Sequence, residues 1–316
     1  MPGSDSIGGG LEFTRIIKEI GRGKNAARDL NRDDARALFA ALLAHEIPDL
    51  QLGAILMALR IKGESLEELA GFLEACETCY PHLVAPAGTV PVVIPAYNGA
   101  RQLPNLTPLL AQLIAREGVP VLVQGVTRDA GRVSTCEVFE AMGISAARSL
   151  DEAQTQLATR KLAFLPLDVL APPLARVLAL RGVIGVRSSG HTLAKMLQPF
   201  ASPAVRLVSV THPAYLKRMR EFFTTHAAHA LLLRGAEGEA VAHPRRQPAM
   251  EWCDGAASQT WTASAEETPA PPALPESRDA AVTALWITEV LAGKRAAPAA
   301  IAHQLQCCLR AVKNVK

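Results

Sequence analysis

The chain has 316 residues, of which 49% are hydrophobic and 20% are charged, with a formal net charge of +3. This composition is ordinary for a globular protein of one large or two smaller domains, and the net charge is too small to name a partner. Aromatic residues make up 4% of the chain, which argues against broad base-stacking platforms. Six cysteines in a chain of this length do not indicate a disulfide framework.

No targeting or membrane segment is evident in the sequence. Met1–Gly10 is rich in Gly and Ser and lacks an apolar core, which predicts a flexible tail and no signal peptide. The longest apolar run, Leu162–Leu180, is broken by several prolines, by Asp168 and by Arg176, so we expect no membrane span there. The cytoplasm is the expected location.

The first part of the chain is expected to be helical. From Phe13 to Cys79, apolar residues recur at spacings of three and four, as in Leu38, Leu42 and Leu43. Pro48 and Gly63 separate successive patterns. The segment is therefore predicted to form about four helices.

From Pro91 onward, short β-branched runs alternate with helical patterns. Val92–Ile94 and Val119–Val123 are typical of buried strands, and Leu106–Glu117 between them is typical of a helix. Strands separated by helices of this length predict a mostly parallel sheet. Further expected strands are Ala163–Pro166, Leu207–Val210 and Ala230–Leu233, and further expected helices are Cys136–Met142, Tyr215–Phe223, Asp279–Leu291 and Ala299–Val312.

Two cysteine pairs could in principle carry chemistry. Cys76 and Cys79 form a C-x-x-C at the end of a helical pattern, but a second such pair, which a zinc site would need, is lacking. A structural role for these thiols is therefore favoured over metal binding or redox chemistry. Cys307 and Cys308 lie in a helical pattern, where core packing is again the favoured role.

Several stretches resemble anthranilate phosphoribosyltransferases and the related pyrimidine nucleoside phosphorylases. The similarity is most specific in Pro48–Cys76, with the core LMALRIKGES. A closer resemblance is to the YbiB-like branch of that superfamily. It depends on IIKEIGRGKNAARDLNRDDAR (Ile16–Arg36), VIPAYNGARQLPNLTPLLA (Val93–Ala111) and GVRSSGHTLAKMLQPF (Gly185–Phe200).

The resemblance implies an α/β fold of the anthranilate phosphoribosyltransferase type, with a small helical domain and a large domain around a mostly parallel sheet. We expect the helical domain at 1–85, joined by helices from about 190–222, and the α/β domain at 86–316 with a Pro-rich loop at 266–278. Members of the YbiB-like branch are described as nucleic-acid-binding homodimers, and the resemblance implies dimerisation through the helical domain.

The motifs that bind substrate in the enzymes are largely replaced. Their G-T-G-G-D loop, whose backbone N–H groups cradle a diphosphate, falls on Pro95–Gly99. Pro95 lacks an N–H and Tyr97 adds bulk. The K-H-G-N motif falls on Val123–Val126, where Gly125 alone is kept. The transfer reaction of the enzymes is therefore not expected, and no catalytic residue or cofactor is assigned.

The magnesium-binding Asp-Glu pair of the enzymes falls near Glu237-Gly238-Glu239. In an extended backbone the two glutamates would point to opposite faces, so a solvated acidic turn is favoured over a turn that holds an ion, and no metal site is predicted. Arg187 matches an arginine that contacts the aromatic carboxylate in the enzymes; a structural contact and a retained anion-binding role stay open. The expected remnant of a ligand pocket comprises Asn98, Gly99, Asn105, Thr107, Gly125 and Arg187.

Basic residues are concentrated in one part of the chain. Between Arg181 and Pro248 there are ten Lys or Arg and three acidic residues, a net charge of +7 against +3 for the whole chain. Five of the eight histidines, including His212, also lie there. Such segregation favours a polyanion-binding face.

The residues expected to contact nucleic acid lie in this region, on a helical stripe near the start of the chain, and beside the altered loops. They are Lys195, Lys217, Arg218, Arg220, Arg245, Arg246, Arg15, Lys18, Arg101, Arg128 and Arg132, with Arg22 continuing the stripe. No base-reading motif is present, so we expect low specificity for single- or double-stranded DNA or RNA. Tyr97 and Tyr215 are the expected stacking platforms.

Three functions are compared. The leading one is a nucleic-acid-binding homodimer without sequence preference. The second is a glycosyltransferase that acts on another ribosyl substrate, which Asn105, Gly125 and Arg187 favour. The third is a protein-interaction scaffold, for which the Pro-rich loop is the sole support.

Overall fold

The computed structural model describes residues 13–23, 26–211, 213–226, 228–246, 248–262 and 273–315. The chain divides into two compact units, each described here by itself. The first comprises the residues up to Cys79 together with Arg176–Leu193, and the second comprises Tyr80–Ala175 and Ala194–Lys316. Three predicted features, the Met1–Gly10 tail, His212 and most of the Pro-rich loop, lie outside the described residues.

The first unit is helical, as predicted. Its helices are α1 (Phe13–Ile20), α2 (Arg32–Leu43), α3 (Asp49–Lys62), α4 (Leu66–Glu77), α10 (Arg181–Ile184) and α11 (Ser189–Leu193). Asn31 and Ser65 cap α2 and α4, because each side chain accepts a hydrogen bond from a backbone N–H of the first turn. The rings of Phe39 and Phe72 pack α2 against α4, with centroids 4.9 Å apart.

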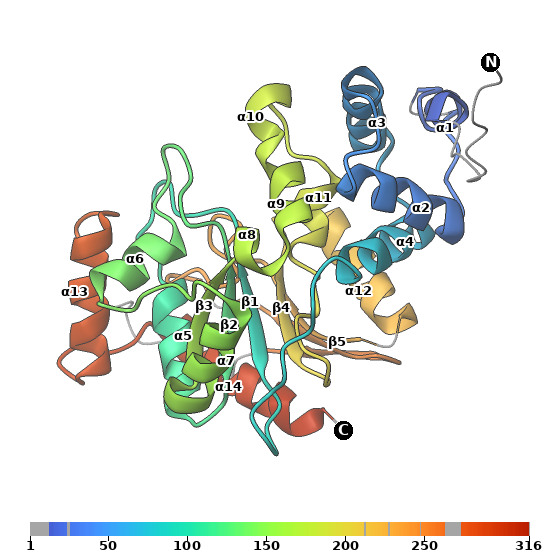
Figure 1. Cartoon of the computed structure of the whole chain (residues 1–316). Helices are drawn as coiled ribbons and strands as arrows, with labels where there is room; N and C mark the ends of the chain where they lie inside the picture. The colour runs from blue at the N-terminus through green and yellow to red at the C-terminus, as the bar shows by residue number, and fades with distance from the viewer. Residues whose placement is uncertain are drawn as a thin grey trace. The chain divides into compact units, whose positions relative to one another are not determined.

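The second unit is built on one seven-stranded sheet of order β3-β2-β1-β4-β5-β6-β7 (Figure 1). The strands are β1 (Val92–Ala96), β2 (Val121–Gly125), β3 (Leu162–Pro166), β4 (Val205–Ser209), β5 (His229–Leu233), β6 (Met250–Asp254) and β7 (Ser258–Trp261). Strands β1 to β5 pair in parallel, whereas β6 and β7 are antiparallel. Every residue of β1 to β4 is buried, as expected for parallel strands covered on both faces.

Helices connect and cover these strands. They are α5 (Thr107–Arg116), α6 (Thr135–Ala141), α7 (Leu150–Arg160), α8 (Leu167–Leu170), α12 (Pro213–Thr225), α13 (Ala280–Leu291) and α14 (Ala299–Asn314), while α9 (Pro172–Ala179) spans the boundary between the units. The connection through α5 leads from β1 to β2, and the connection through α12 leads from β4 to β5, in the opposite direction along the sheet. Right-handed crossovers therefore place α5 and α12 on opposite faces.

The order of the strands reverses between β1 and β4, which makes this the topological switch point of the sheet. In open α/β sheets, ligands bind in the crevice outside the carboxyl ends of the strands at such a point. We call the side on which β1 to β5 end the carboxyl edge. The loop that follows β1 lies there, and so does the chain between β5 and β6.

The mostly parallel sheet and its five parallel strands are confirmed, whereas α7 and the β6–β7 hairpin had not been predicted. The hairpin does carry a turn signal. Gly255 has φ 93°, and the Asp254 carboxylate accepts hydrogen bonds from the N–H groups of Ala256 and Ala257. Among the described residues, none of the helices has the length and apolar character needed to cross a membrane.

All six cysteines are free thiols. Burial raises the pKa of the Cys76 thiol well above its ordinary value and also raises the pKa of Cys79. The Cys79 Sγ lies 2.8 Å from the Cys76 carbonyl oxygen, a local contact at the end of α4. Because a thiol kept protonated is a poor nucleophile and a poor metal ligand, these contacts favour a structural role for the pair.

Candidate functional site

A buried carboxylate, that of Glu239 between β5 and β6, contacts the loop that follows β1. The Glu239 side chain is 2% exposed, and its Oε1 accepts hydrogen bonds from the backbone N–H groups of Asn98 and Gly99, each at 2.7 Å. Its Oε2 accepts from the hydroxyls of Thr107 (3.4 Å) and Thr135 (3.2 Å). Both oxygens therefore have protein donors, which is what a buried carboxylate requires.

Opposing effects act on the ionisation of Glu239. Burial raises the pKa of its carboxyl group above the ordinary value, while the N–H donors and the nearby Lys195 charge act in the opposite direction. The net shift is upward, because removal from water penalises the charged form more than these partners stabilise it.

A second carboxylate covers the rest of the same loop. Glu237 accepts hydrogen bonds from the N–H groups of Arg101 (3.0 Å), Gln102 (3.0 and 3.2 Å) and Leu103 (3.1 Å). Together the two glutamates accept hydrogen bonds from five of the six backbone N–H groups of residues 98 to 103. The remaining N–H group, that of Ala100, donates to the Val133 carbonyl.

A tight turn brings the two glutamates to one loop. Glu237 and Gly238 both have positive φ, 52° and 91°, and the Glu239 N–H donates to the Ala236 carbonyl at 2.9 Å. The Asn98 side-chain amide donates to the Gly238 carbonyl at 2.5 Å. A left-handed conformation costs a residue other than glycine about 1–3 kcal/mol, so these contacts hold Glu237 in a conformation it would otherwise avoid. The favoured interpretation of a solvated acidic turn is therefore wrong for both carboxylates.

Tyr97 is not a stacking platform, which corrects the prediction. Its side chain is 5% exposed, and its hydroxyl donates to the side-chain oxygen of Gln124, whose amide in turn donates to the Ala194 carbonyl. The retained Gly125 lies beside β1, where a Cβ atom would come within 1.9 Å of the Ala96 carbonyl oxygen. Close packing of β1 and β2 thus accounts for this glycine without any ligand.

Five of the six predicted pocket residues lie in the second unit, and three of them, Asn98, Gly99 and Thr107, contact Glu239. The Asn105 amide donates to the Val133 carbonyl (3.2 Å) and to the Thr135 hydroxyl (3.1 Å), and its oxygen accepts from the Thr107 N–H (3.2 Å). Arg187 belongs to the first unit, where its carbonyl oxygen accepts from the side chain of Arg60.

Arginine side chains fasten the outer side of the loop. The Arg132 guanidinium donates to the Gly99 carbonyl at 3.4 Å. The guanidinium of Arg278 donates to the carbonyls of Arg101 (2.7 Å) and Gly131 (3.0 Å). Sequence reasoning missed Arg278, because its position just before α13 gives no hint that it returns to the loops after β1 and β2.

Two other predicted basic residues near these loops have protein partners. Arg128, which follows β2, is exposed and pairs with Glu140 at 2.7 Å. Lys195 is half-buried, and its Nζ donates to the Ser209 carbonyl at 3.3 Å. Lys195 is therefore placed to act on Glu239 by its charge more than to reach a ligand in solvent.

The basic residues of α12 differ in their surroundings. The Lys217 side chain is 74% exposed. Arg218 lies over the ring of Tyr215, with its guanidinium carbon 5.7 Å from the ring centroid, and Tyr215 is 39% exposed. The Arg220 guanidinium instead makes two hydrogen bonds to Glu251 on β6, which competes with the phosphate contact predicted for it.

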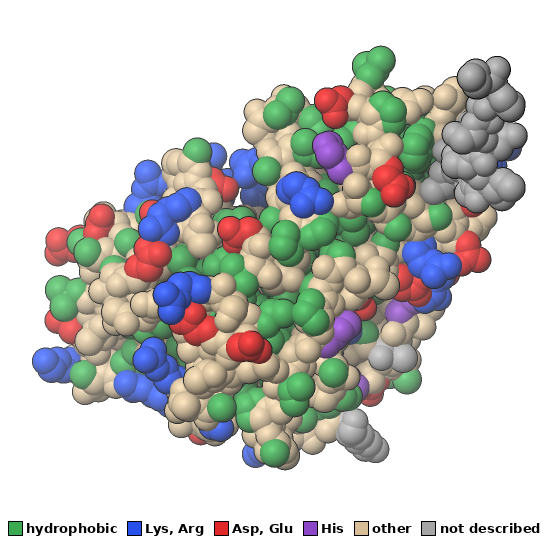
Figure 2. Space-filling model, in the orientation of Figure 1, with side chains coloured by type: hydrophobic (Ala, Val, Ile, Leu, Met, Phe, Trp, Pro, Cys, Tyr) green, Lys and Arg blue, Asp and Glu red, His purple; other side chains and the backbone are tan. Residues whose placement is uncertain are grey.

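The basic segment is not one continuous surface, which corrects the prediction of a single basic face from the charge count. Arg181 and Arg187 lie in the first unit, and Arg206 is 6% exposed with its guanidinium over the ring of Phe223. Exposed basic residues do follow the parallel strands at the carboxyl edge of the second unit; we call Arg101, Arg128, Arg234, Arg245 and Arg246 the carboxyl-edge arginines. On the face that Figure 2 shows, Lys and Arg side chains are interspersed with Asp and Glu.

On the first unit, Arg15 and Lys18 are both exposed on α1. The predicted continuation, Arg22, lies beyond the end of the helix and pairs with Glu19 at 2.7 Å.

The acidic turn does not fit a magnesium ion. Gly238 supplies no carboxylate, and the oxygens of Glu237 and Glu239 accept hydrogen bonds from the loop N–H groups, so they are directed at donors and away from a shared cation site. Among the residues that the structure describes, no group of three or more His, Cys, Asp and Glu side chains could hold a metal ion.

Comparison with known proteins gives consistent results along the chain. Residues 14–77 match the family described as the glycosyl transferase family, helical bundle domain. The Escherichia coli (strain K12) protein YbiB is 46% identical over 301 residues, which cover 95% of this chain and 94% of that protein. An anthranilate phosphoribosyltransferase of Desulfitobacterium hafniense (strain Y51) is 30% identical over 215 residues, which cover 68% of this chain and 61% of that enzyme. The aligned part thus spans less than two thirds of that enzyme.

Solved structures agree with this fold. The anthranilate phosphoribosyltransferase of Thermus thermophilus superposes with a TM-score of 0.75 at 21% identity, covering 95% of this chain and 87% of that one. The enzyme of Saccharomyces cerevisiae in complex with PRPP and Mg also gives a TM-score of 0.75, at 12% identity, over 96% of this chain and 89% of that one. At these identities the likeness establishes the fold alone.

Proposed function

The chain belongs to the glycosyltransferase family 3, or anthranilate phosphoribosyltransferase-like, superfamily, in the same family as YbiB, and we propose that it uses this framework to bind nucleic acid. The ligand is single- or double-stranded DNA or RNA, held by its phosphates with little sequence preference. The protein acts as a homodimer.

The observation that carries this proposal is the placement of the carboxyl-edge arginines. They come from separate parts of the sequence, after β1, after β2 and between β5 and β6, and all five are exposed. Parallel strands end at one side of a sheet, so these guanidinium groups lie along the same edge. Lys and Arg side chains supply most of the sequence-independent affinity of proteins for nucleic acids, because binding releases counterions from the phosphates.

The hydrogen bonds of the loop after β1 argue against the transfer reaction of the related phosphoribosyltransferases. The enzyme of Saccharomyces cerevisiae was solved in complex with PRPP and Mg, and phosphates are commonly held by backbone N–H groups of such loops. Here Glu237 and Glu239 already accept five of these N–H groups. A diphosphate would meet two carboxylates in place of donors.

A fluorescent oligonucleotide tests the proposal. Anisotropy is followed at low and near-physiological salt with the wild-type protein, the Arg245→Glu variant and the Arg160→Glu variant. Both substitutions change the charge by the same amount, but Arg160 ends α7 shortly before β3 begins and so lies at the opposite edge of the sheet. We expect Arg245→Glu to weaken binding about ten-fold, the equivalent of roughly 1.4 kcal/mol, and Arg160→Glu to change it little. Equal losses would contradict the assignment of the edge, and no binding at low salt would contradict the function.

The second candidate is transfer of a ribosyl group from another substrate. It is favoured by the cluster of Asn105, Thr107 and Thr135, whose polar groups surround Glu239 at the switch point. A ligand that binds the native state raises the melting temperature. A rise with millimolar phosphoribosyl pyrophosphate or a nucleoside would support this candidate, and an unchanged melting temperature would count against it.

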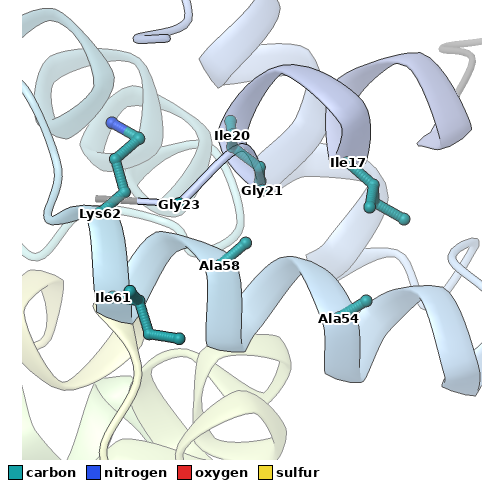
Figure 3. Close-up of a pocket in the computed structure, with 8 residues that line it drawn as sticks. All are labelled: Ile17, Ile20, Gly21, Gly23, Ala54, Ala58, Ile61 and Lys62. Atoms are coloured by element: carbon teal, nitrogen blue, oxygen red, sulfur yellow. The ribbon is translucent and has the colours of Figure 1, made fainter. Parts of the chain in front are cut away.

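The proposed dimer is supported by an apolar surface on the first unit. Leu50 is 88% exposed and Ile61 59% exposed on α3, and Val183 is 86% exposed on α10. Ile61 also borders a pocket of about 260 Å³ between α1 and α3, whose floor is formed by small residues including Ala54 and Ala58 (Figure 3). These exposed apolar side chains are the ones that we propose the second copy covers.

Light scattering after size exclusion tests the dimer. We expect the mass of two chains for the wild-type protein and of one chain for Ile61→Glu, because a buried charge in the interface has no partner. A matched control is Leu285→Glu, since Leu285 is 63% exposed on α13 in the second unit. A single-chain mass for the wild-type protein would contradict this part of the proposal.

A further inference from the structure

Successive backbone N–H groups converge on the Glu237 carboxylate. The N–H groups of Arg101, Gln102 and Leu103 donate to it at 3.0 to 3.1 Å, with a further 3.2 Å contact from Gln102. A run of N–H groups directed at one point forms an anion-binding concavity, of the kind that holds phosphate in other proteins. In this chain the anion is one of its own side chains.

The two glutamates are held differently. Glu239 is buried and also accepts from the hydroxyls of Thr107 and Thr135, so it is part of the core of the unit. Glu237 is half-buried at the tip of the turn, and it reaches N–H groups of exposed residues, Arg101 and Gln102. Glu237 can therefore be removed without opening the core.

Cationic groups lie next to the three N–H donors. The Arg278 guanidinium is bonded to the carbonyl of Arg101, and the Arg101 side chain is exposed. Arg132 is bonded to the carbonyl of Gly99 in the same loop. Each of these hydrogen bonds is made to a carbonyl oxygen, so the guanidinium groups of Arg132 and Arg278 fasten the outer side of the loop and leave its N–H groups directed at the carboxylate.

We propose that the Glu237 carboxylate is an internal anion that occupies a phosphate-binding concavity formed by residues 101–103 and keeps phosphorylated small molecules out of it. The concavity itself remains intact, and removal of the carboxylate opens it to a free phosphate or diphosphate. This inference concerns the backbone N–H groups of residues 101–103, whereas the proposed nucleic-acid binding uses exposed arginine side chains, that of Arg101 among them.

The test is the Glu237→Ala variant with inorganic pyrophosphate as the probe, without added metal. Calorimetry measures binding, and the melting temperature is followed with and without pyrophosphate. We expect Glu237→Ala to bind at least ten-fold more tightly than the wild-type protein and to regain with pyrophosphate part of the melting temperature it loses. Glu117→Ala is the matched control, since it removes the same charge from the exposed residue that follows the far end of α5.

Two results would overturn the proposal. In the first, the wild-type protein or Glu117→Ala binds pyrophosphate as tightly as Glu237→Ala. In the second, a folded Glu237→Ala protein gains no binding, which would make the carboxylate a structural fastening of the turn and nothing more. If Glu237→Ala does not fold, Glu237→Gln, which keeps the shape and removes the charge, decides between the same outcomes.

Oligonucleotide binding measured on the same preparations separates this proposal from the proposed function. A protein that binds no oligonucleotide contradicts the proposed function, and the pyrophosphate titration then still decides the role of Glu237.

Discussion

The Arg220 guanidinium and the Glu251 carboxylate form a two-point ion pair that joins α12 to β6. The Arg220 Nε lies 2.6 Å from Oε2, and Nη2 lies 2.5 Å from Oε1. The Arg220 side chain is 40% exposed, while Glu251 is 10% exposed. The parallel alignment of the two groups is the geometry in which guanidinium–carboxylate pairs are strongest.

Replacement of Arg220 by alanine should therefore destabilise the second unit. Glu251 would lose its cation while it stays largely buried, and we expect the free energy of unfolding to fall by about 1–2 kcal/mol, between the values for exposed and fully buried pairs. Urea denaturation measures this change. The control is Lys217→Ala on the same helix, which should change stability by less than about 0.5 kcal/mol because Lys217 is exposed. Equal stability of the two variants would show that the pair contributes little.

Gly125 should be intolerant of any side chain. A Cβ atom there would lie 1.9 Å from the Ala96 carbonyl oxygen, a backbone atom that cannot move without disturbing the pairing of β1 with β2. We expect Gly125→Ala to lower the free energy of unfolding by about 1–3 kcal/mol or more, the cost of overpacking a core. Gly53→Ala provides the comparison, since nothing lies within 4 Å of its Cβ position on α3 and alanine is the better helix former. A lower melting temperature for Gly53→Ala than for Gly125→Ala would contradict this expectation.

The sheet could be predicted from sequence where its strands are buried on both faces. Val92–Ile94 and Ala230–Leu233 are short apolar runs, and both lie within observed strands. Strands β6 and β7 gave no such signal, because Met250–Asp254 contains charged residues and the Ser258–Gln259–Thr260 part of β7 is exposed. Strand β7 is an edge strand with exposed residues, which weakens its apolar pattern, whereas β6 is buried except at Asp254 and was missed because of its polar residues.

Part of the site was predictable as a set of residues but not as an arrangement. The comparison of motifs placed Asn98, Gly99, Asn105 and Thr107 in one remnant pocket, whereas Glu239, which contacts Asn98, Gly99 and Thr107 in the structure, was assigned to a solvated turn. The role of Glu237 could not be predicted, because it depends on two consecutive positive φ angles, and glutamate rarely adopts one. Partners more than 130 residues apart in sequence, such as Glu237 and Leu103, carry no local signal.

Acidification should destabilise the second unit through His229. Burial lowers the pKa of its imidazole, the Arg206 charge lowers it further, and Asp254 acts in the opposite direction. As pH falls below about 6.5, the unfolded chain takes up a proton before the folded chain does, so the free energy of unfolding decreases with falling pH until the folded pKa is reached. His229→Gln should show a shallower decrease in urea denaturation between pH 7.5 and 5.5. Some decrease should remain, since burial also lowers the pKa of His243 and His303. A dependence identical to that of the wild-type protein would exclude His229 as a contributor.

The salt dependence of nucleic-acid binding should report how many arginines bind phosphate. Arg245 and Arg246 are adjacent and exposed between β5 and β6, so one bound strand can reach both. Removal of each arginine–phosphate interaction should reduce the slope of log K against log salt by about 0.7 for a single strand and about 0.9 for a duplex. The Arg245→Ala/Arg246→Ala protein should therefore bind more weakly at low salt and approach the wild-type affinity as salt increases. Anisotropy titrations at four or more salt concentrations measure the slope. A parallel loss of affinity at all salt concentrations would mean that the two arginines act through the fold of the loop and not by binding phosphate.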